Sequence, residues 1–192
     1  MQDIEFLQYA VNLARENVEQ GGRPFGAVIV YQGELVSTGV NQILAHNDPT
    51  SHAELNAVRQ ACQKLQRLSL KDCVVYASGQ PCPMCLAAMR MVGVEKIVYA
   101  YSNSDAEPYG LSTEQVAVQL RQLPQEQDGL QFVQLKLDLP FHLYQIWQQS
   151  SFGVLRVKMN NPTIIIKKAR MSDSYLLKVE GLNSSVRVKR IE

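Results

Sequence analysis

Two short polar segments constrain this chain most, because each stands at the start of a predicted helix. His52-Ala-Glu54 follows loop-forming residues, and Pro81-Cys-Pro-Met-Cys85 follows a predicted strand and loop. Two cysteines separated by two residues at a helix N-terminus can direct both thiolates at one ion, and the helix dipole there favours the deprotonated form that binds metal. A neutral imidazole from His52 would supply a third ligand. Together the two segments predict a metal site formed by His52, Cys82 and Cys85.

The ligand count of this predicted site favours catalytic zinc. Catalytic zinc sites keep three protein ligands and one open position, whereas structural sites usually take four. No further ligand is evident: Cys62 and Cys73 are interpreted as packed core thiols, and His46 and His142 lack a neighbour at ligand spacing. We expect a protein that is not exported to an oxidising compartment, so the thiols are expected to stay reduced.

Glu54 is the candidate proton carrier of the site. A carboxylate near a zinc-bound water can take its proton, leave hydroxide as the nucleophile and return protons to the leaving group, which is hydrolysis of a polarised C–N bond. Each segment alone has other interpretations. His-x-Glu is also typical of a capped helix start, and Cys-x-x-Cys of a redox dithiol or of core packing.

Hydrophobic periodicity predicts an α/β fold, with a sheet covered by helices. Apolar residues at spacings of three and four indicate helices, and alternating or continuous apolar runs between turn residues indicate strands. The expected elements are a helix over 3–18, a β-hairpin over 25–44 with its turn at 32–33, a helix over 52–65, a strand over 73–77, a helix over 84–92, a strand over 97–100, a helix over 113–122, a fifth strand over 130–137 and a helix over 141–148.

Charge divides the chain near residue 150. Residues 1–150 hold 10 basic and 15 acidic side chains, a net charge of −5, whereas residues 151–192 hold 9 and 3, a net charge of +6. The second stretch contains no Cys, His or Trp, so the chemistry is expected before residue 150. Short strands separated by turns are predicted there, over 154–158, 163–167, 175–179 and 186–191. We interpret residues 151–192 as a basic, β-rich C-terminal extension of unknown role.

Localisation and partners follow from two further features. The chain contains no apolar run of the roughly 18 residues that a membrane span needs, and its start is acidic rather than basic and apolar. A cytoplasmic protein without a membrane partner is therefore expected. The overall net charge of +1 by itself indicates neither nucleic acid nor membrane as a partner.

The order H-x-E followed by P-C-x-x-C resembles the signature of zinc deaminases that act on nucleobases. Over about residues 1–148 the chain resembles the cytidine deaminase superfamily, which implies a three-layer fold with a mixed five-stranded sheet flanked by helices. The resemblance implies that residues 1–150 form a zinc deaminase domain, with His52, Cys82 and Cys85 as ligands of Zn²⁺ and Glu54 as proton shuttle.

Within this superfamily the chain looks most like the bacterial guanine deaminases. The similar segments are Gly22-Arg-Pro-Phe-Gly-Ala-Val-Ile-Val30, Asn47-Asp-Pro-Thr-Ser-His-Ala-Glu54 and Val58-Arg-Gln-Ala-Cys62. This resemblance implies hydrolysis of guanine to xanthine and ammonia through attack by zinc hydroxide, in a homodimer. It places Asn41 against the base and Phe25 on the pocket wall, and Tyr109 is a candidate lid residue.

Two positions depart from the pattern of these relatives. Gln80 stands where they usually have Glu before Pro-Cys, which removes a charge near the metal. Thr113 stands where they place an acidic residue toward the base, with Glu114 as the next candidate. A threonine hydroxyl can accept or donate one hydrogen bond but does not replace a carboxylate toward a donor edge.

Three alternatives follow from these departures and from the charge distribution. The first is a tRNA adenosine deaminase, which the basic C-terminal segment supports as a nucleic-acid contact and the net charge of −5 over residues 1–150 opposes. The second is a cytosine or nucleoside deaminase. The third is a deaminase-fold protein that keeps zinc as a structural ion and is not an enzyme; Glu54 counts against it, because a structural site needs no proton shuttle.

Overall fold

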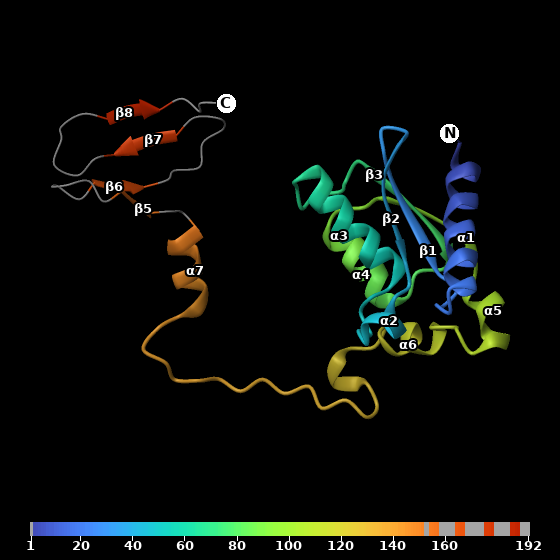
Figure 1. Ribbon diagram of the computed structural model, residues 1–192. Coiled ribbons are helices and arrows are strands. Elements are labelled where there is room, and N and C mark those ends of the chain that lie inside the picture. The colour runs from blue at the N-terminus through green and yellow to red at the C-terminus, as the bar shows by residue number, and fades with distance from the viewer. Residues whose placement is uncertain (1, 152–153, 158–163, 168–174, 179–184, 189–192) are drawn as a thin grey trace. The chain divides into compact units, whose positions relative to one another are not determined.

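The structure is a computed structural model that describes residues 2–151 and, beyond them, residues 154–157, 164–167, 175–178 and 185–188. It divides into two compact units, Met1–Phe132 and Val133–Glu192, which are treated separately below (Figure 1). The predicted boundary of the deaminase domain near residue 150 stays a prediction.

The first unit contains a mixed sheet of four strands. Its order is β2-β1-β3-β4, in which β1 pairs antiparallel with both β2 and β3, and β3 pairs parallel with β4. The elements are α1 (Asp3–Glu19), β1 (Gly26–Tyr31), β2 (Glu34–Val40), α2 (Ile43–His46), α3 (Ala53–Leu65), β3 (Cys73–Gly79), α4 (Pro83–Met91), β4 (Lys96–Tyr101), α5 (Asn103–Ala106), the 3₁₀ helix η1 (Glu107–Tyr109), α6 (Glu114–Gln119) and the 3₁₀ helix η2 (Pro124–Glu126). The predicted α/β organisation is confirmed.

Strand β1 lies in the middle layer and is buried on both faces, so its residues alternate between two cores. Val28 and Val30 pack with Phe6 of α1 on one face. Ala27 and Ile29 belong to the core on the other face, where α3 and α4 cover the sheet (Figure 1). This arrangement places the starts of α3 and α4 on the same side of the sheet.

Two glycines let helices approach this sheet closely. A Cβ atom at Gly26 would overlap the Ala10 carbonyl of α1, and one at Gly39 would overlap the Ala53 carbonyl of α3. Only a residue without a Cβ atom fits these positions. Gly39 therefore helps to set the distance between β2 and the first turn of α3.

The predicted fifth strand over residues 130–137 is wrong. The structure has no regular secondary structure there, and the side chains of Phe132, Val133 and Leu135 are exposed. Alternating apolar residues satisfy the pattern of a strand, but a strand also needs a hydrogen-bonding neighbour. Within the described residues, the segment pairs with no other strand. The sheet of the first unit accordingly has four strands instead of five.

Other boundaries move by a few residues. The second strand of the predicted hairpin ends at Val40 and not at residue 44, because α2 begins at Ile43. The helix predicted over 113–122 is the shorter α6.

In the part of the second unit that the structure describes, there are one helix and two antiparallel strand pairs. Helix α7 (Leu143–Ser151) is followed by the pair β5 (Val154–Val157) and β6 (Ile164–Lys167), and then by β7 (Tyr175–Lys178) and β8 (Ser185–Val188). The remaining residues of the strands predicted in this stretch lie outside the described residues. Among the described residues, no helix is both long and apolar enough to cross a membrane.

Candidate metal centre and active-site cavity

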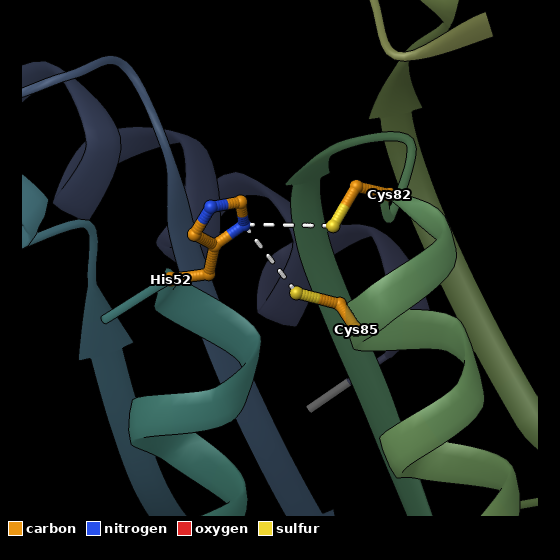
Figure 2. Close-up of side chains that lie close together, drawn as sticks. All are labelled: His52, Cys82 and Cys85. Atoms are coloured by element: carbon orange, nitrogen blue, oxygen red, sulfur yellow. Dashed lines mark hydrogen bonds between the residues drawn. The ribbon is translucent and has the colours of Figure 1, made fainter. Parts of the chain in front are cut away.

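The three predicted metal ligands meet at the starts of two helices. His52 immediately precedes α3, and Cys82 immediately precedes α4, whose first turn contains Cys85 (Figure 2). The His52 Nδ1 atom lies 3.5 Å from Cys82 Sγ and 3.6 Å from Cys85 Sγ. The candidate ligand atoms all lie within 4.8 Å of one another. The structure therefore brings together the ligand set that the two sequence segments predict.

Local sequence explains why the ligands project from helix starts. Pro83 occupies the first position of α4, where its fixed φ suits a helix and its missing N–H would be unpaired in any case. The Cys82 carbonyl accepts the Leu86 N–H, and the His52 carbonyl accepts the Asn56 N–H, so these two residues occupy the N-cap positions of their helices. Such N-capping residues have extended backbone, which turns their side chains out of the helix.

The chemistry of the three donors fits zinc. One imidazole nitrogen and two sulfur atoms form the soft donor set typical of zinc, and they leave a fourth position open. Hydrogen bonding from Cys85 lowers the pKa of the Cys82 thiol to about 4 and, for the same reason, raises the pKa of the Cys85 thiol. The hydrogen bond to Cys82 raises the pKa of His52. One thiolate is thus already stabilised without metal, and metal binding releases the remaining protons.

Glu54 lies beside the ligands and is almost entirely buried, with 6% of its surface exposed. Burial raises the pKa of its carboxyl group. Although Glu54 is only two residues from His52, both side chains line the same cavity, because His52 stands outside the helix and Glu54 in its first turn. A carboxyl group beside the open position of a zinc site can accept a proton from water and pass it on.

The cavity beside the three ligands has a volume of about 470 Å³. This volume falls in the range of sites for small molecules. Four of the residues predicted to contact substrate line it, namely Phe25, Asn41, Tyr109 and Thr113. Glu114 is not among the lining residues. Its carboxylate instead accepts a hydrogen bond from Asn103 and pairs with Arg121.

Asn41 is oriented by its own surroundings. Its Oδ1 atom accepts the Ile43 N–H at 3.3 Å, and its backbone carbonyl accepts a hydrogen bond from Asn17. The Asn41 side chain is buried and lines the cavity. Among the described residues, none bonds to its Nδ2 group, which is therefore the part of Asn41 available to donate to a ligand.

Three residues that shape the cavity were not predicted as site residues. Gln80 lines the cavity, and its Oε1 atom accepts the Asn103 N–H at 3.1 Å. The amide thus anchors the start of α5. Asn103 also lines the cavity, and Asn17 donates to the carbonyls of Arg23 and Asn41. Gln80 is marked in the sequence by its place before Pro-Cys, but Asn17 and Asn103 carry no such signal, because their partners lie elsewhere along the chain.

Known proteins are similar to this chain over the region that contains the candidate metal site. Residues 1–101 match the family described as the cytidine and deoxycytidylate deaminase zinc-binding region. Guanine deaminase of Bacillus subtilis (strain 168) is 39% identical over 144 residues, which cover 74% of this chain and 92% of that protein. The X-ray structure of guanine deaminase from Bacillus subtilis superposes with a TM-score of 0.71 at 38% identity, covering 77% of this chain and 94% of that one.

A second group of relatives matches a shorter stretch. The tRNA-specific adenosine deaminase of Aquifex aeolicus (strain VF5) is 37% identical over 95 residues, which cover 50% of this chain and 63% of that protein. The similarity to the guanine deaminase therefore covers more of this chain than the similarity to the tRNA-specific adenosine deaminase does.

Proposed function

We propose, since the chain belongs to the family of zinc-dependent cytidine and deoxycytidylate deaminases, that its substrate is guanine, which it hydrolyses to xanthine and ammonia. The observation that carries this proposal is the length of the likeness. It covers 92% of a guanine deaminase, whereas the likeness to a tRNA adenosine deaminase covers 63% of that enzyme. The described cavity supports it, because its volume suits a small, free ring.

In this proposal His52, Cys82 and Cys85 hold the zinc ion. When bound, zinc acts as a Lewis acid that makes water a competent nucleophile near neutral pH. Glu54 takes a proton from the attacking water and passes it to the exocyclic amine, and the second proton of the water ends on the adjacent ring nitrogen as the carbonyl group of xanthine forms. The oxygen of water bonds to the ring carbon that carries this amine, the C–N bond breaks, and the amine leaves as ammonia.

The remaining lining residues hold the base. The Asn41 Nδ2 group donates a hydrogen bond to an acceptor atom of the ring, since its Oδ1 atom is already occupied by the Ile43 N–H. The Phe25 ring lies over Gly79, where a Cβ atom would contact the ring at 3.2 Å, and presents an aromatic wall to the base. Tyr109, which lies in η1, covers the bound base and limits the entry of water.

A second candidate is the deamination of adenosine in tRNA. The family relatives with that activity and the net charge of +6 over residues 151–192 favour it. Homodimer formation and contact of the basic segment with nucleic acid stay predictions, to be checked by the mass of the protein in solution and by its binding to RNA.

Ammonia release by the zinc-loaded protein tests the proposal. The panel contains guanine, adenine, cytosine, their nucleosides and a tRNA anticodon stem-loop, each measured with the native chain, with Glu54→Gln and with Glu34→Gln. Glu34 is exposed on β2 and does not line the cavity, so its substitution is the matched control. We expect activity on guanine, a loss of about 10²- to 10⁴-fold in kcat for Glu54→Gln, and no change for the control.

Zinc content is measured in every variant, so that a lost proton carrier is distinguished from a lost metal. Activity on the stem-loop alone would replace guanine by tRNA as the substrate. Full activity of Glu54→Gln would refute the proton-shuttle role. One bound zinc per chain with no activity on any substrate would favour the structural-zinc interpretation.

A further inference from the structure

Asn103 forms the centre of a buried hydrogen-bond network at the wall of the cavity. Only 9% of its surface is exposed. Its Oδ1 atom accepts two hydrogen bonds from one residue, from the Thr113 N–H and from the Thr113 hydroxyl, both at 3.3 Å. Its Nδ2 group donates to Glu114 Oε2 at 3.0 Å. Asn103 and Thr113 both line the cavity.

The orientation of the Asn103 amide is fixed from both ends. The Thr113 backbone N–H can only donate, so it must face an oxygen, and the Glu114 carboxylate accepts, so it must face the amide nitrogen. Turning the amide over would place two donors against each other at one end and two acceptors at the other. The two partners therefore assign the Asn103 oxygen to Thr113 without ambiguity.

Neighbouring residues hold this arrangement in place. Arg121 pairs with the Glu114 carboxylate at 3.5 Å, which keeps a negative charge facing the Asn103 amide nitrogen. Gln80 accepts the Asn103 backbone N–H, so the peptide group that carries the amide is anchored as well. The network thus runs from the surface at Arg121 to the cavity wall at Thr113.

This network determines what the Thr113 hydroxyl offers a ligand. A hydroxyl group has one proton to donate and two lone pairs to accept with. The proton of Thr113 is directed to Asn103, so the hydroxyl presents lone pairs. A side chain that could otherwise donate or accept is thereby restricted to accepting.

We propose that Asn103 is a positioning residue for substrate specificity, which fixes the Thr113 hydroxyl as the acceptor for the N1–H group of guanine. This proposal rests on the proposed function. It assigns to Thr113 part of the role that the sequence comparison expects of a carboxylate. Glu114 acts indirectly, by orienting Asn103, and does not itself contact the base.

2-Aminopurine tests the direction of this hydrogen bond. It carries the same 2-amino group as guanine, but its N1 atom is an acceptor without a proton. An accepting Thr113 favours guanine and opposes 2-aminopurine. A hydroxyl free to rotate could donate to the N1 atom of 2-aminopurine and would no longer discriminate between the two bases.

The experiment measures kcat/KM for guanine and for 2-aminopurine in the native chain and in Asn103→Leu, Thr113→Val and Thr113→Ser. We expect the preference for guanine to fall about 10-fold in Asn103→Leu and in Thr113→Val, and to persist in Thr113→Ser, which keeps the hydroxyl. Gln115→Leu is the matched control, because Gln115 is exposed in α6 and lies outside the cavity. An equal loss on both bases in Asn103→Leu and Thr113→Val would show a merely structural role and overturn the proposal.

Binding measurements keep this test separate from the proposed function. The fluorescence of 2-aminopurine reports its own binding without turnover, and displacement by guanine gives the guanine affinity. If the native chain does not deaminate guanine, the proposed function fails. A guanine preference in binding that falls in Asn103→Leu and Thr113→Val would still support the role of Asn103. An unchanged preference, or no binding of either base, would overturn it. Thr113→Val is nearly isosteric, so it remains informative if Asn103→Leu does not fold.

Discussion

The two ends of the cavity are constructed differently. At the metal end, the candidate ligands His52, Cys82 and Cys85 stand at or within the first turn of α3 and α4, and the packing of both helices on one face of the sheet brings them to one point. At the proposed substrate end, hydrogen bonds with side-chain amides hold the lining residues: Asn103 accepts from the Thr113 hydroxyl, and Asn17 donates to the Asn41 backbone carbonyl. The candidate ligands thus come from two short motifs, whereas the lining residues of the proposed substrate end depend on hydrogen bonds with side-chain amides. Each end should therefore fail in its own way when it is altered.

Loss of a metal ligand should give the largest effect. Cys82→Ser replaces a thiolate with a much poorer zinc ligand, so we expect zinc affinity to fall by at least about 100-fold and deaminase activity to disappear with it. Metal analysis of the purified protein and ammonia release are the measurements. Cys62→Ala is the matched control, because Cys62 is a free, partly buried thiol outside the ligand set. Equal zinc loss in both variants would show that the ligand assignment is wrong.

Gly39→Ala tests whether the metal end depends on the packing of α3. The added Cβ atom would overlap the Ala53 carbonyl, so α3 must move, and we expect a loss of about 3 kcal/mol in the free energy of unfolding together with weaker zinc binding. Gly21→Ala introduces strain at a φ of +86° but meets open space, so it should cost about 1 kcal/mol and leave zinc binding unchanged. Urea unfolding and zinc titration distinguish the two. Unaltered zinc affinity in Gly39→Ala would mean that the helix start tolerates displacement.

Asn17→Ala should affect the substrate end and spare the metal end. It leaves the buried Asn41 carbonyl without its side-chain donor and removes one of the two donors to the Arg23 carbonyl, which keeps the Phe25 N–H, at a cost of about 1–3 kcal/mol in the free energy of unfolding. We expect KM for guanine to rise while zinc content stays at one ion per chain. Asn12→Ala on the same helix is the matched control, since the Asn12 side chain accepts its hydrogen bond from Gln8 within the helix and does not line the cavity. A drop in zinc content would contradict the division between the two ends.

Asp3→Asn should have the smallest effect and should alter neither the metal end nor the substrate end of the cavity. Hydrogen bonds from Lys96 and Tyr76 lower the pKa of Asp3, and none of the three residues lines the cavity. Because the folded-state pKa lies below the ordinary value of 3.8, the ionised group stabilises the fold above that pH, and the contribution disappears as the pH falls through the lowered pKa. Urea unfolding should give a lower free energy of unfolding for the variant than for the native chain at pH 7, and this difference should disappear as the pH falls. KM and zinc content should not change. If the difference in the free energy of unfolding grew at acid pH, the sign assigned to this interaction would be wrong.

The fold was predictable where local pattern and tertiary contacts agree. The helix over 3–18 and the strands around 25–31, 73–77 and 97–100 have apolar patterns that match the layers of the sheet, and the structure places α1, β1, β3 and β4 there. The segment 130–137 has an equally good alternating pattern, but in the described chain it has no strand beside it. Periodicity reports which side chains could be buried together. It does not report whether a hydrogen-bonding partner exists.

By itself, the sequence determined the candidate metal ligands and the neighbouring carboxylate, because His52, Glu54, Cys82 and Cys85 lie in two short motifs at predicted helix starts. Only the tertiary structure decided the roles at the wall of the cavity. It placed Glu114 behind Asn103 instead of in the cavity, and it joined Gln80 to the Asn103 backbone. The physical reason is that an amide or hydroxyl group takes its direction from whichever donor or acceptor the fold places beside it, and those partners are far away in the sequence.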